Sequence, residues 1–447
     1  MRVKLLPVLL LLAIAPLSGH AEDLMEAYQQ AIANDPVLST ADATRLVVAE
    51  GVPQARSALL PQLSASLGLE QIHGSDGSTV DANGNSVTTS SIGHTRERDI
   101  STQLSQPIIN FASIATLRAA HATSDSQEQT YRAALQNLYV RVASAYFNVL
   151  VAEDSLDINK AYEDAYKQEY EQSSERFKDG LATAADMTQS QAYYQYIKTQ
   201  RISSQDNLKD ALRGLEQITG KPTGTLKKLR DDLPMQPPVP NDAKAWVDAA
   251  METNPTILAG HYAVTADERK ITAARAGHLP TISATLNYGK FGSWSSAVPG
   301  SSANGPGITT VGLVLNVPIF SGGLTQSQVR QAIYQRDEDE GNLETLRRQA
   351  ARDANNYFNL VTDGIEQVSS ARTSQEAATK SVASMRAGYA IGTQTLTNVV
   401  FAIQTLAEVQ SQYTVVRHQF ILNKLLLKQA AGTVDMHDLE DINRLLQ

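Results

Sequence analysis

The residues best suited to metal or acid–base chemistry are gathered in one polar stretch of the N-terminal half. His73 and His94 flank this stretch, and Asp76 and Asp81 lie inside it. Imidazole and carboxylate groups are common metal ligands, but the spacing of these four residues matches no ligand template. Residues 81–85, Asp-Ala-Asn-Gly-Asn, resemble the start of a calcium loop, yet the glycine is misplaced and the distal glutamate is absent. We interpret the stretch as a solvated loop containing an Asn-Gly turn.

Composition and motifs exclude other chemistry. The 447 residues contain no cysteine, which removes disulfides, thiolate metal sites and cysteine nucleophiles. No H-E-x-x-H sequence, phosphate-binding P-loop or nucleophile elbow occurs. The net charge of −9 argues against a nucleic-acid partner, because phosphate binding needs a basic surface. The sequence therefore predicts no enzyme, no cofactor and no metal site.

Residues 1–21 have the pattern of a secretory signal peptide. Arg2 and Lys4 precede an apolar core at residues 5–15, and Gly-His-Ala at residues 19–21 forms a small-residue cleavage site. No cysteine follows this site, so we expect no N-terminal lipid anchor. No later run of about 18 apolar residues predicts a transmembrane helix. The expected class is a periplasmic protein, an extracellular protein or an outer-membrane β-barrel, which hydropathy does not separate.

A duplicated stretch organises the rest of the chain. Residues 55–67 (ARSALLPQLSASL) and 274–286 (ARAGHLPTISATL) lie at a constant offset of 219 residues. In both copies a helix-like segment ends at a Leu-Pro pair, and strict alternation of apolar and polar residues follows. A period of two is typical of a strand with one apolar and one polar face. Pro61 and Pro280 suit the start of such a strand, where the missing N–H removes no ladder hydrogen bond.

The alternating pattern predicts four strands and two exposed loops. The strands cover about 62–72, 99–109, 281–289 and 309–319. The loops, 73–98 and 290–307, are rich in small and polar residues. A proline stands near each of the four strand–helix joins: Pro61, Pro107, Pro280 and Pro318. If the strands cross a membrane, all helices are therefore expected on one side of that membrane and both loops on the other.

Long helices are predicted between the strands. Residues 112–177 contain neither proline nor glycine, and a helix of this length would be a rod of order 90–100 Å. Heptad-like apolar spacing at Leu138, Val142, Ala145 and Val149 indicates coiled-coil packing. Further helices are expected at about 185–219, 324–387 and 395–431, with shorter ones before each strand pair. Each copy is thus helix–strand–loop–strand–helix–turn–helix.

Four strands of about ten residues are long enough to cross a bilayer but too few to close. An open sheet in lipid leaves edge N–H and C=O groups unpaired, each costing several kcal/mol. Two chains would give eight strands with a nearly filled lumen, whereas three would give twelve and a water-filled lumen. The inward residues are small and polar, so we favour three chains. The predicted fold mixes α and transmembrane β structure: a 12-stranded antiparallel β-barrel formed by three chains, continuous with an α-helical coiled-coil barrel.

The same residues carry a family resemblance. They are the duplicated Leu-Pro strand starts, residues 317–323 (VPIFSGG), and the turns 177–181 (FKDGL) and 388–393 (GYAIGT). On these motifs the chain resembles the TolC family of outer-membrane efflux and secretion proteins over almost all of residues 22–440. It is more similar to the type I secretion relatives than to the lipidated drug-efflux branch.

The resemblance implies the function, the partners and the location. A homotrimer in the Gram-negative outer membrane, in contact with lipid, would extend into the periplasm as a helical tunnel. It would take substrates from an inner-membrane ABC or proton-driven transporter through a periplasmic adaptor, for type I secretion, multidrug efflux or both. The implied divisions are a signal peptide (1–21), a first repeat (22–230), a proline-rich linker (231–241), a second repeat (242–432) and a tail near the equatorial region (433–447).

The resemblance also implies site residues at the periplasmic tip. Asp186 and Tyr389 match the family's gate, whereas Ala185, Gln394, Asn398 and Phe401 stand where the founding member has Thr, Arg, Asp and Asp. The implied gate comprises Asp186, Tyr389, Gln394, Asn398 and Phe401, with one acidic ring and a more apolar constriction at Phe401. The implied adaptor contacts are at the two turns: Lys178, Asp179, Gly180, Leu181, Gly392 and Thr393.

Simpler interpretations stand beside these assignments. Asp186 suits a helix cap, Tyr389 suits packing at a turn, and Asn398 and Phe401 could be ordinary helix residues. An exposed turn needs no adaptor. For the whole chain, the alternative is a structural periplasmic or surface coiled-coil protein without transport activity, whose four alternating segments pack as a soluble sheet.

Overall fold

The computed structural model describes residues 21–73, 77–80, 83, 85–89, 94–295 and 302–447. Most of the predicted signal peptide, and Asp76 and Asp81 of the predicted metal-like loop, lie outside these residues. The described residues form two compact units: unit 1 comprises residues 21–41, 131–255 and 347–447, and unit 2 comprises the described residues within 42–130 and 256–346. Each unit draws on both copies of the duplication.

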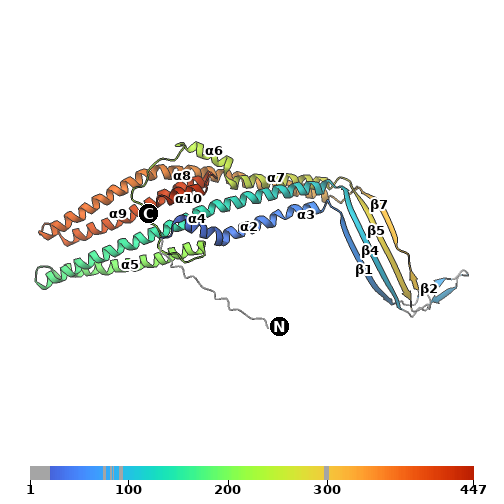
Figure 1. Cartoon of the computed structure of the whole chain (residues 1–447), viewed down its shortest axis with the longest axis horizontal. Coiled ribbons are helices and arrows are strands. Elements are labelled where there is room, and N and C mark those ends of the chain that lie inside the picture. Colours follow the sequence, from blue (N-terminus) through green and yellow to red (C-terminus); the bar gives the residue numbers. More distant parts are fainter. Residues whose placement is uncertain (1–20, 74–76, 81–82, 84, 90–93, 296–301) are drawn as a thin grey trace, which may run out of the picture. The chain divides into compact units, whose positions relative to one another are not determined.

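The order of the elements repeats along the chain, which confirms the predicted internal duplication (Figure 1). The helices in the described part are α1 (Leu24–Asn34), α2 (Pro36–Ala49), α3 (Gly51–Ser57), α4 (Phe111–Lys178), α5 (Ala184–Thr219), α6 (Ala243–Thr253), α7 (Pro255–Ala276), α8 (Leu324–Ala390), α9 (Leu396–Ala430) and α10 (Met436–Asn443). The strands there are β1 (Gln62–His73), β2 (Gly77–Val80), β3 (Ser86–Thr89), β4 (His94–Ile109), β5 (Thr281–Ser295), β6 (Ser302–Asn304) and β7 (Ile308–Asn316).

The duplication extends to how the second long helix of each copy ends. Gly220 follows α5 and Gly432 lies just beyond α9, and both have positive φ, 70° and 75°. A Cβ on Gly220 would lie 2.8 Å from Cβ of Asn34, and one on Gly432 would lie 2.5 Å from Cα of Asn254. Both asparagines stand at the helix breaks before Pro36 and Pro255. Each position therefore requires glycine for two reasons: the left-handed backbone conformation and the close approach of the asparagine.

Unit 2 contains the main sheet. Its pairing order is β1-β4-β5, with β6 and β7 following one another along the free side of β5, and the described pairings are antiparallel. The four long ribbons run side by side, and each joins a helical segment at the same end (Figure 1). The four predicted strands are present in the predicted order as β1, β4, β5 and β7, and the described part of the chain adds the short strands β2, β3 and β6. The outer edges of this sheet are β1 on one side and β6 with β7 on the other.

The strands differ from the prediction in length. β4 begins at His94 and β5 continues to Ser295, so both run into the predicted loops, and β2 pairs β3 as a separate hairpin. The polar residues of these extensions give no apolar alternation, which is why the pattern missed them. β4 also continues two residues past Pro107, so this proline lies inside the strand rather than at the join. The pairing register shifts there, and a shift accommodates the absent N–H.

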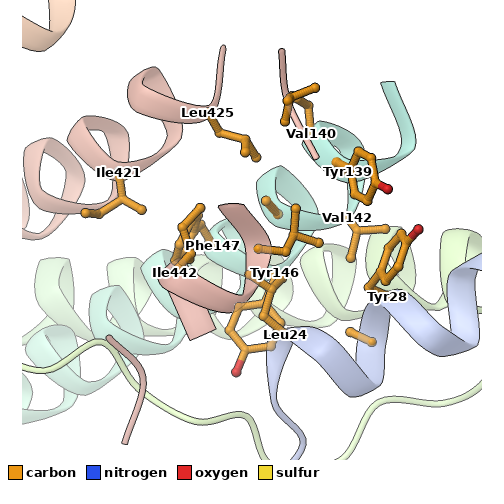
Figure 2. Packing of buried hydrophobic residues seen from close by; sticks show 14 of the residues in the cluster. Leu24, Tyr28, Tyr139, Val140, Val142, Tyr146, Phe147, Ile421, Leu425 and Ile442 are labelled. Atoms are coloured by element: carbon orange, nitrogen blue, oxygen red, sulfur yellow. The ribbon is translucent and has the colours of Figure 1, made fainter. Parts of the chain in front are cut away.

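Unit 1 has its own hydrophobic core where α1, α4, α5, α9 and α10 meet. Figure 2 shows Leu24 and Tyr28 of α1 packed against Val142 and Tyr146 of α4. Tyr146 is fully buried, and its hydroxyl donates toward the backbone oxygens of Glu22 and Lys227, both at 3.0 Å. One side chain therefore ties the N-terminal segment and the segment after α5 to the long helix.

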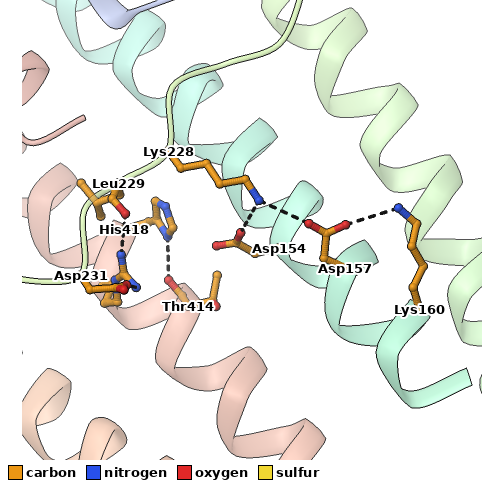
Figure 3. A network of polar contacts seen from close by, with 9 residues as sticks. Asp154, Asp157, Lys160, Lys228, Leu229, Asp231, Thr414 and His418 are labelled. Carbon is orange, nitrogen blue, oxygen red and sulfur yellow. Dashed lines mark hydrogen bonds and ion pairs between the residues drawn. The ribbon is translucent and has the colours of Figure 1, made fainter. Parts of the chain in front are cut away.

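A polar network borders this core (Figure 3). Lys228 pairs with Asp154 at 3.4 Å and with Asp157 at 3.3 Å on α4. Next to it, His418 of α9 is 4% exposed and its Nδ1 lies 2.8 Å from the carbonyl oxygen of Thr414. Because a carbonyl only accepts, Nδ1 carries the proton.

This histidine makes the stability of the core depend on pH. Burial, helped by the neighbouring Arg417, lowers the pKa of His418 despite opposing contributions from the Thr414 carbonyl and Asp154. The unfolded chain, with a histidine pKa of about 6.5, then takes up the proton before the folded chain does. We expect stability to fall by up to about 1.4 kcal/mol per pH unit as pH drops below about 6.5, until the folded pKa is reached. Urea unfolding of wild type and His418→Asn at several pH values measures this. The exposed His437 provides the control His437→Asn, and an equal pH slope in wild type and His418→Asn would contradict the assignment.

Candidate channel wall and gate

The main sheet separates apolar from polar side chains across all four ribbons. One row joins Leu63, Leu104, Leu286 and Val311 as direct cross-strand partners. The row displaced by one residue joins Ser64, Gln103, Asn287 and Thr310. Because successive side chains on a strand point to opposite faces, the first row lies on one face and the second row on the other. The register therefore gives the sheet one apolar and one polar face.

The apolar face is not covered within the chain. Leu63 is 71% exposed and Val311 is 74% exposed, and they belong to the two edge strands. On the polar face the hydroxyls of Ser66 and Ser101 hydrogen-bond across the strands at 2.7 Å. A free apolar face of this kind is energetically unfavourable in water. The sheet as a whole is suited to contact with lipid on its apolar face and with water on its polar face.

The first tip lies between α4 and α5. Thr183 is the N-cap of α5, and Asp186 occupies the third helical position of a complete capping box. The Asp186 carboxylate accepts from the Thr183 hydroxyl at 2.7 Å and from its backbone N–H at 3.2 Å. The simpler interpretation of Asp186 as a capping residue is thus correct in kind, although Thr183 is the N-cap itself. Capping uses the carboxylate as an acceptor and leaves its negative charge in place.

The second tip lies between α8 and α9. Its N-cap is Thr395, whose hydroxyl accepts from the N–H of Asn398 at 3.3 Å. The amide of Asn398 donates to the side-chain oxygen of Gln394 at 2.8 Å. Asn398 and Phe401, three residues apart, lie on one side of α9, and Gln394 in the turn before the helix is tied to that side by its hydrogen bond with Asn398. Phe401 is 68% exposed there, although its neighbours Val399 and Val400 are buried.

Tyr389 packs at the same end of unit 1. It contacts a cluster formed by the two helical hairpins, which includes Tyr166, Val399 and Ile403. The Arg176 guanidinium lies 5.1 Å from the centre of the Tyr389 ring, a cation–π distance. The structure therefore supports packing for Tyr389, and its hydroxyl has no hydrogen bond among the described residues. Arg176 was not anticipated from the sequence, because only proximity in space links it to Tyr389.

The predicted adaptor-contact residues form the two tip turns. Gly180 and Gly392 adopt positive φ of 71° and 79°, and a Cβ on either would meet nothing within 4 Å. Lys178 pairs with Glu175 at 2.7 Å, so its charge is partly compensated. Leu181 and Ile391 are 70% and 77% exposed. Ile391 lies within the predicted tip turn 388–393, and it matches Leu181 as a second exposed apolar residue.

Two ion pairs near the tips were also missed. Arg386 of α8 lies 3.4 Å from Glu169 of α4, and Arg201 of α5 lies 2.5 Å from Glu163 of α4. Burial raises the pKa of Glu169, and the nearby Arg386 opposes this rise. Charged residues that face each other across a coiled coil leave no distinctive sequence signal.

No metal or membrane-helix signature accompanies these elements in the described part of the chain. Within those residues, no group of three or more His, Cys, Asp or Glu side chains could hold a metal ion. Within them, no helix combines the length and apolar character that crossing a membrane requires.

Comparison with known proteins identifies the family. The family model described as "Outer membrane efflux protein" matches residues 27–221 and 246–433. The outer membrane protein TolC of Escherichia coli K12 is 31% identical over 99% of this chain and 89% of its own length. TolC of Vibrio cholerae is 28% identical over 98% of both chains. The alkaline protease secretion protein AprF of Pseudomonas aeruginosa is 26% identical over 94% of this chain and 87% of its own length.

Solved structures share the fold. The CmeC outer membrane channel of Campylobacter jejuni superposes with a TM-score of 0.77 at 17% identity, covering 95% of this chain and 90% of that one. The open MtrE outer membrane channel of Neisseria gonorrhoeae gives 0.70 at 16% identity, with coverage of 92% and 89%.

These matches confirm the resemblance, the outer-membrane location and the helical periplasmic tunnel, and they set aside the alternative of a structural protein without transport. The chain belongs to the outer membrane efflux protein family, and it is an export channel rather than an enzyme.

Proposed function

We propose that three copies of this chain close into one twelve-stranded barrel. The observation that carries the proposal is the two-faced sheet with both edges open. In lipid, the unpaired N–H and C=O groups of β1 and β7 would cost several kcal/mol each. β1 and β7 of one chain are separated by β4 and β5, so only a neighbouring copy can supply the missing partner. Antiparallel pairing of β1 with a neighbour's β7 would continue the order without interruption.

The polar face favours three copies over two. Its side chains include Ser64, Gln103, Asn287 and Thr310, which are small or hydrogen-bonding. An eight-stranded barrel has an interior that side chains nearly fill, whereas a larger one leaves a channel for water. Polar side chains that line water keep their hydrogen bonds, and the apolar face meets lipid.

The helical part would form the tunnel that receives the cargo. TolC and AprF are an outer membrane protein and a protease secretion protein, which supports partnership with an inner-membrane transporter and a periplasmic adaptor. We assign adaptor contact to the tip turns, Lys178–Leu181 with Gly392 and Thr393, because Leu181 and Ile391 there expose apolar surface. We retain residues 22–230 and 242–432 as the two repeats, joined by the linker 231–241.

An export assay tests this function. Cells that lack their own channel should regain secretion of a type I cargo, or resistance to an effluxed compound, when they express this chain with its cognate transporter and adaptor. Omission of the adaptor alone should abolish export although the channel is still inserted. Undiminished export without any adaptor would contradict the proposal.

The gate is assigned to the tips: Asp186, Tyr389, Gln394, Asn398 and Phe401. Three copies would place three Asp186 carboxylates and three Phe401 rings around the axis. A ring of like charge enriches counter-ions in the pore, so Asp186 should confer cation preference and Phe401 should confer none.

Single-channel recordings test the acidic ring. Asp186→Asn keeps an oxygen acceptor for the cap but removes the charge. It should therefore reduce the cation-to-anion permeability ratio by up to about tenfold, the low end of the roughly 10–10³-fold enrichment that one-sign clefts give. Asp186→Ala, which also removes the cap, separates loss of charge from loss of structure. If the reversal potential of Asp186→Asn equals that of wild type, Asp186 does not line the constriction.

A substitution in the Phe401 ring is expected to change cation preference in the opposite direction. Phe401→Asp should raise cation preference, because it would add three carboxylates where the wild type has three aromatic rings. Phe401→Asn provides the control, because it changes the size and polarity of the side chain without adding a charge. Unaltered conductance and selectivity in Phe401→Asp would show that Phe401 faces away from the lumen.

A further inference from the structure

Charged side chains at the helix-distal end of the main sheet are sorted by face. The apolar face carries Arg96, Arg98 and Lys290, because the register places them in line with Gln71, Leu69 and Leu67 of β1. The polar face carries Glu70 of β1 and Glu97 and Asp99 of β4, and along β4 these two acids alternate with Arg96 and Arg98. Among the described residues of these rows, the apolar face has no acid and the polar face has no base. Such segregation is costly unless each face meets a different environment.

The basic residues have no carboxylate partner in the part of the chain that the structure describes. No ion pair joins Arg96, Arg98 or Lys290 to an acid within the described residues. Arg96 donates from Nε to the side-chain oxygen of Gln71 at 3.2 Å. Nε of Arg98 is buried and has no hydrogen-bond partner there, and its guanidinium lies 5.3 Å from the ring centre of Trp294. The stacked ring orients this guanidinium, and its terminal N–H groups, unlike the buried Nε, stay available to a ligand.

The position along the strand corresponds to one membrane interface. Lys290 is nine residues beyond the start of β5 at Thr281, about 30 Å along the strand and about 23 Å in height at a tilt near 40°. The apolar band of an outer-membrane barrel is about 25 Å tall and is bordered by aromatic residues. Tyr288 and Trp294 share the apolar face of β5 with Lys290, since all three have even numbers. The basic residues therefore begin where the apolar band ends.

The leaflet follows from the connectivity. β1 and β5 start at helices and β4 and β7 lead into helices, so all helix joins lie at one end of the sheet. The helices form the periplasmic tunnel, and the opposite strand ends therefore face the cell exterior. The outer leaflet there consists of a phosphorylated glycolipid, and phosphate is the group that arginine binds with paired donors.

We propose that Arg96, Arg98 and Lys290 form a binding site for the phosphate groups of the outer-leaflet glycolipid, lipopolysaccharide. The inference rests on the proposed barrel, which makes the apolar face the lipid-facing one. Arg98 and Arg96 engage phosphate oxygens with guanidinium N–H groups, and Lys290 adds a point charge one row nearer the membrane centre. Tyr288, one row nearer the membrane centre than Lys290, contacts the upper acyl chains, and Trp294 stays stacked on Arg98 in the headgroup region. Three such sites per trimer would anchor the barrel at a fixed depth.

The test uses the purified full-length trimer and three probes. These are bisphosphorylated lipid A, the same lipid after removal of both phosphates, and inorganic phosphate as a competitor, with bound lipid counted by native mass spectrometry. A basic residue near an anionic surface contributes roughly a fivefold change in affinity. We expect Arg96→Gln/Arg98→Gln/Lys290→Gln to weaken bisphosphorylated lipid A binding on the order of a hundredfold. Binding of the dephosphorylated lipid should stay unchanged.

The matched control alters the same number of charges on the opposite face. Glu70→Gln/Glu97→Gln/Asp99→Asn should leave lipid A binding as it is in wild type. If the triple variant assembles poorly, Lys290→Gln alone replaces it in the test. This single variant is expected to lose roughly fivefold in affinity for bisphosphorylated lipid A. Equal binding of both lipids by wild type, equal loss in both triple variants, or full displacement by millimolar inorganic phosphate would overturn the lipid site.

The oligomeric state of each sample separates this inference from the proposed barrel. If wild type is trimeric and binds the two lipids equally, the barrel stands and the phosphate site is wrong. If wild type forms no closed trimer, the barrel is wrong and the lipid site is overturned with it.

Discussion

Leu286→Arg is expected to prevent stable assembly in the outer membrane, whereas Asn287→Arg, one residue further on, is expected to assemble. Leu286 belongs to the apolar row of the sheet, and it lies five residues from the start of β5, about 12 Å up a band of about 25 Å. An arginine at this depth on the lipid face costs about 2–4 kcal/mol per site, and a trimer has three sites. Asn287 faces the proposed water-filled lumen, where a charge stays hydrated.

Heat-modifiable trimer in outer-membrane fractions measures this difference. The two variants carry the same new side chain on the same strand at nearly the same depth, so expression and charge effects are matched. We expect little Leu286→Arg trimer and near wild-type amounts for Asn287→Arg. Equal assembly of both variants would contradict a lipid-facing apolar row.

Tyr146→Ala is expected to destabilise unit 1 by about 3–5 kcal/mol, as aromatic-to-alanine changes in cores do. The ring is fully buried and its hydroxyl donates to two backbone carbonyls, which would lose their partner. The duplication supplies the control, because Tyr146-Phe147-Asn148 recurs as Tyr357-Phe358-Asn359. Tyr357 is only partly buried, so Tyr357→Ala should cost far less.

Urea midpoints of the detergent-solubilised protein, followed by circular dichroism, compare the two tyrosines. Tyr146→Phe separates the contributions, since it keeps the ring and removes the hydroxyl, for a loss of about 1–2 kcal/mol. A Tyr146→Ala midpoint equal to that of Tyr357→Ala would show that the two copies have equivalent cores.

The comparison of the two tyrosines also shows what a repeat in sequence does not reveal. Identical residues recur at equivalent places, yet Tyr146 is fully buried and hydrogen-bonds to Glu22 and Lys227, whereas Tyr357 is only partly buried. Burial depends on elements that approach from elsewhere in the chain. The heptad pattern predicted that α4 packs, and Leu138, Val142 and Val149 are indeed fully buried. It did not predict which helices cover them.

For the sheet, the sequence supplied the faces but not the full length. Alternation around Leu63 and Leu286 identified the strands, because one face is apolar. Beyond the apolar band the strands continue with charged residues such as Glu97 and Arg98. Hydropathy no longer alternates there, because both faces are polar, although successive side chains still point to opposite faces. Acidic and basic residues alternate between odd and even positions of this extension. That alternation would have predicted both the longer strand and the different charge of its two faces.

At the tips, the local signals were present in the sequence but were read too narrowly. Thr183 followed by Asp186 is the spacing of a capping box, which places the cap at Thr183. The neighbours of Tyr389 and the exposure of Phe401 could not be predicted, because they depend on how two hairpins pack. Whether these residues gate the channel stays a prediction.

Cross-linking of the sheet edges tests most directly whether copies complete one another's barrel. The chain has no cysteine, so Ser64→Cys in β1 can be combined with a cysteine at Thr310, Gly312 or Val314 in β7. Within one chain these edges are three strand spacings apart, about 14 Å, which a disulfide does not span. We predict that one combination yields oxidised trimers, closed by three disulfides and separated by reductant. Conducting pores composed of single chains, with no intermolecular disulfide in any combination, would contradict the account.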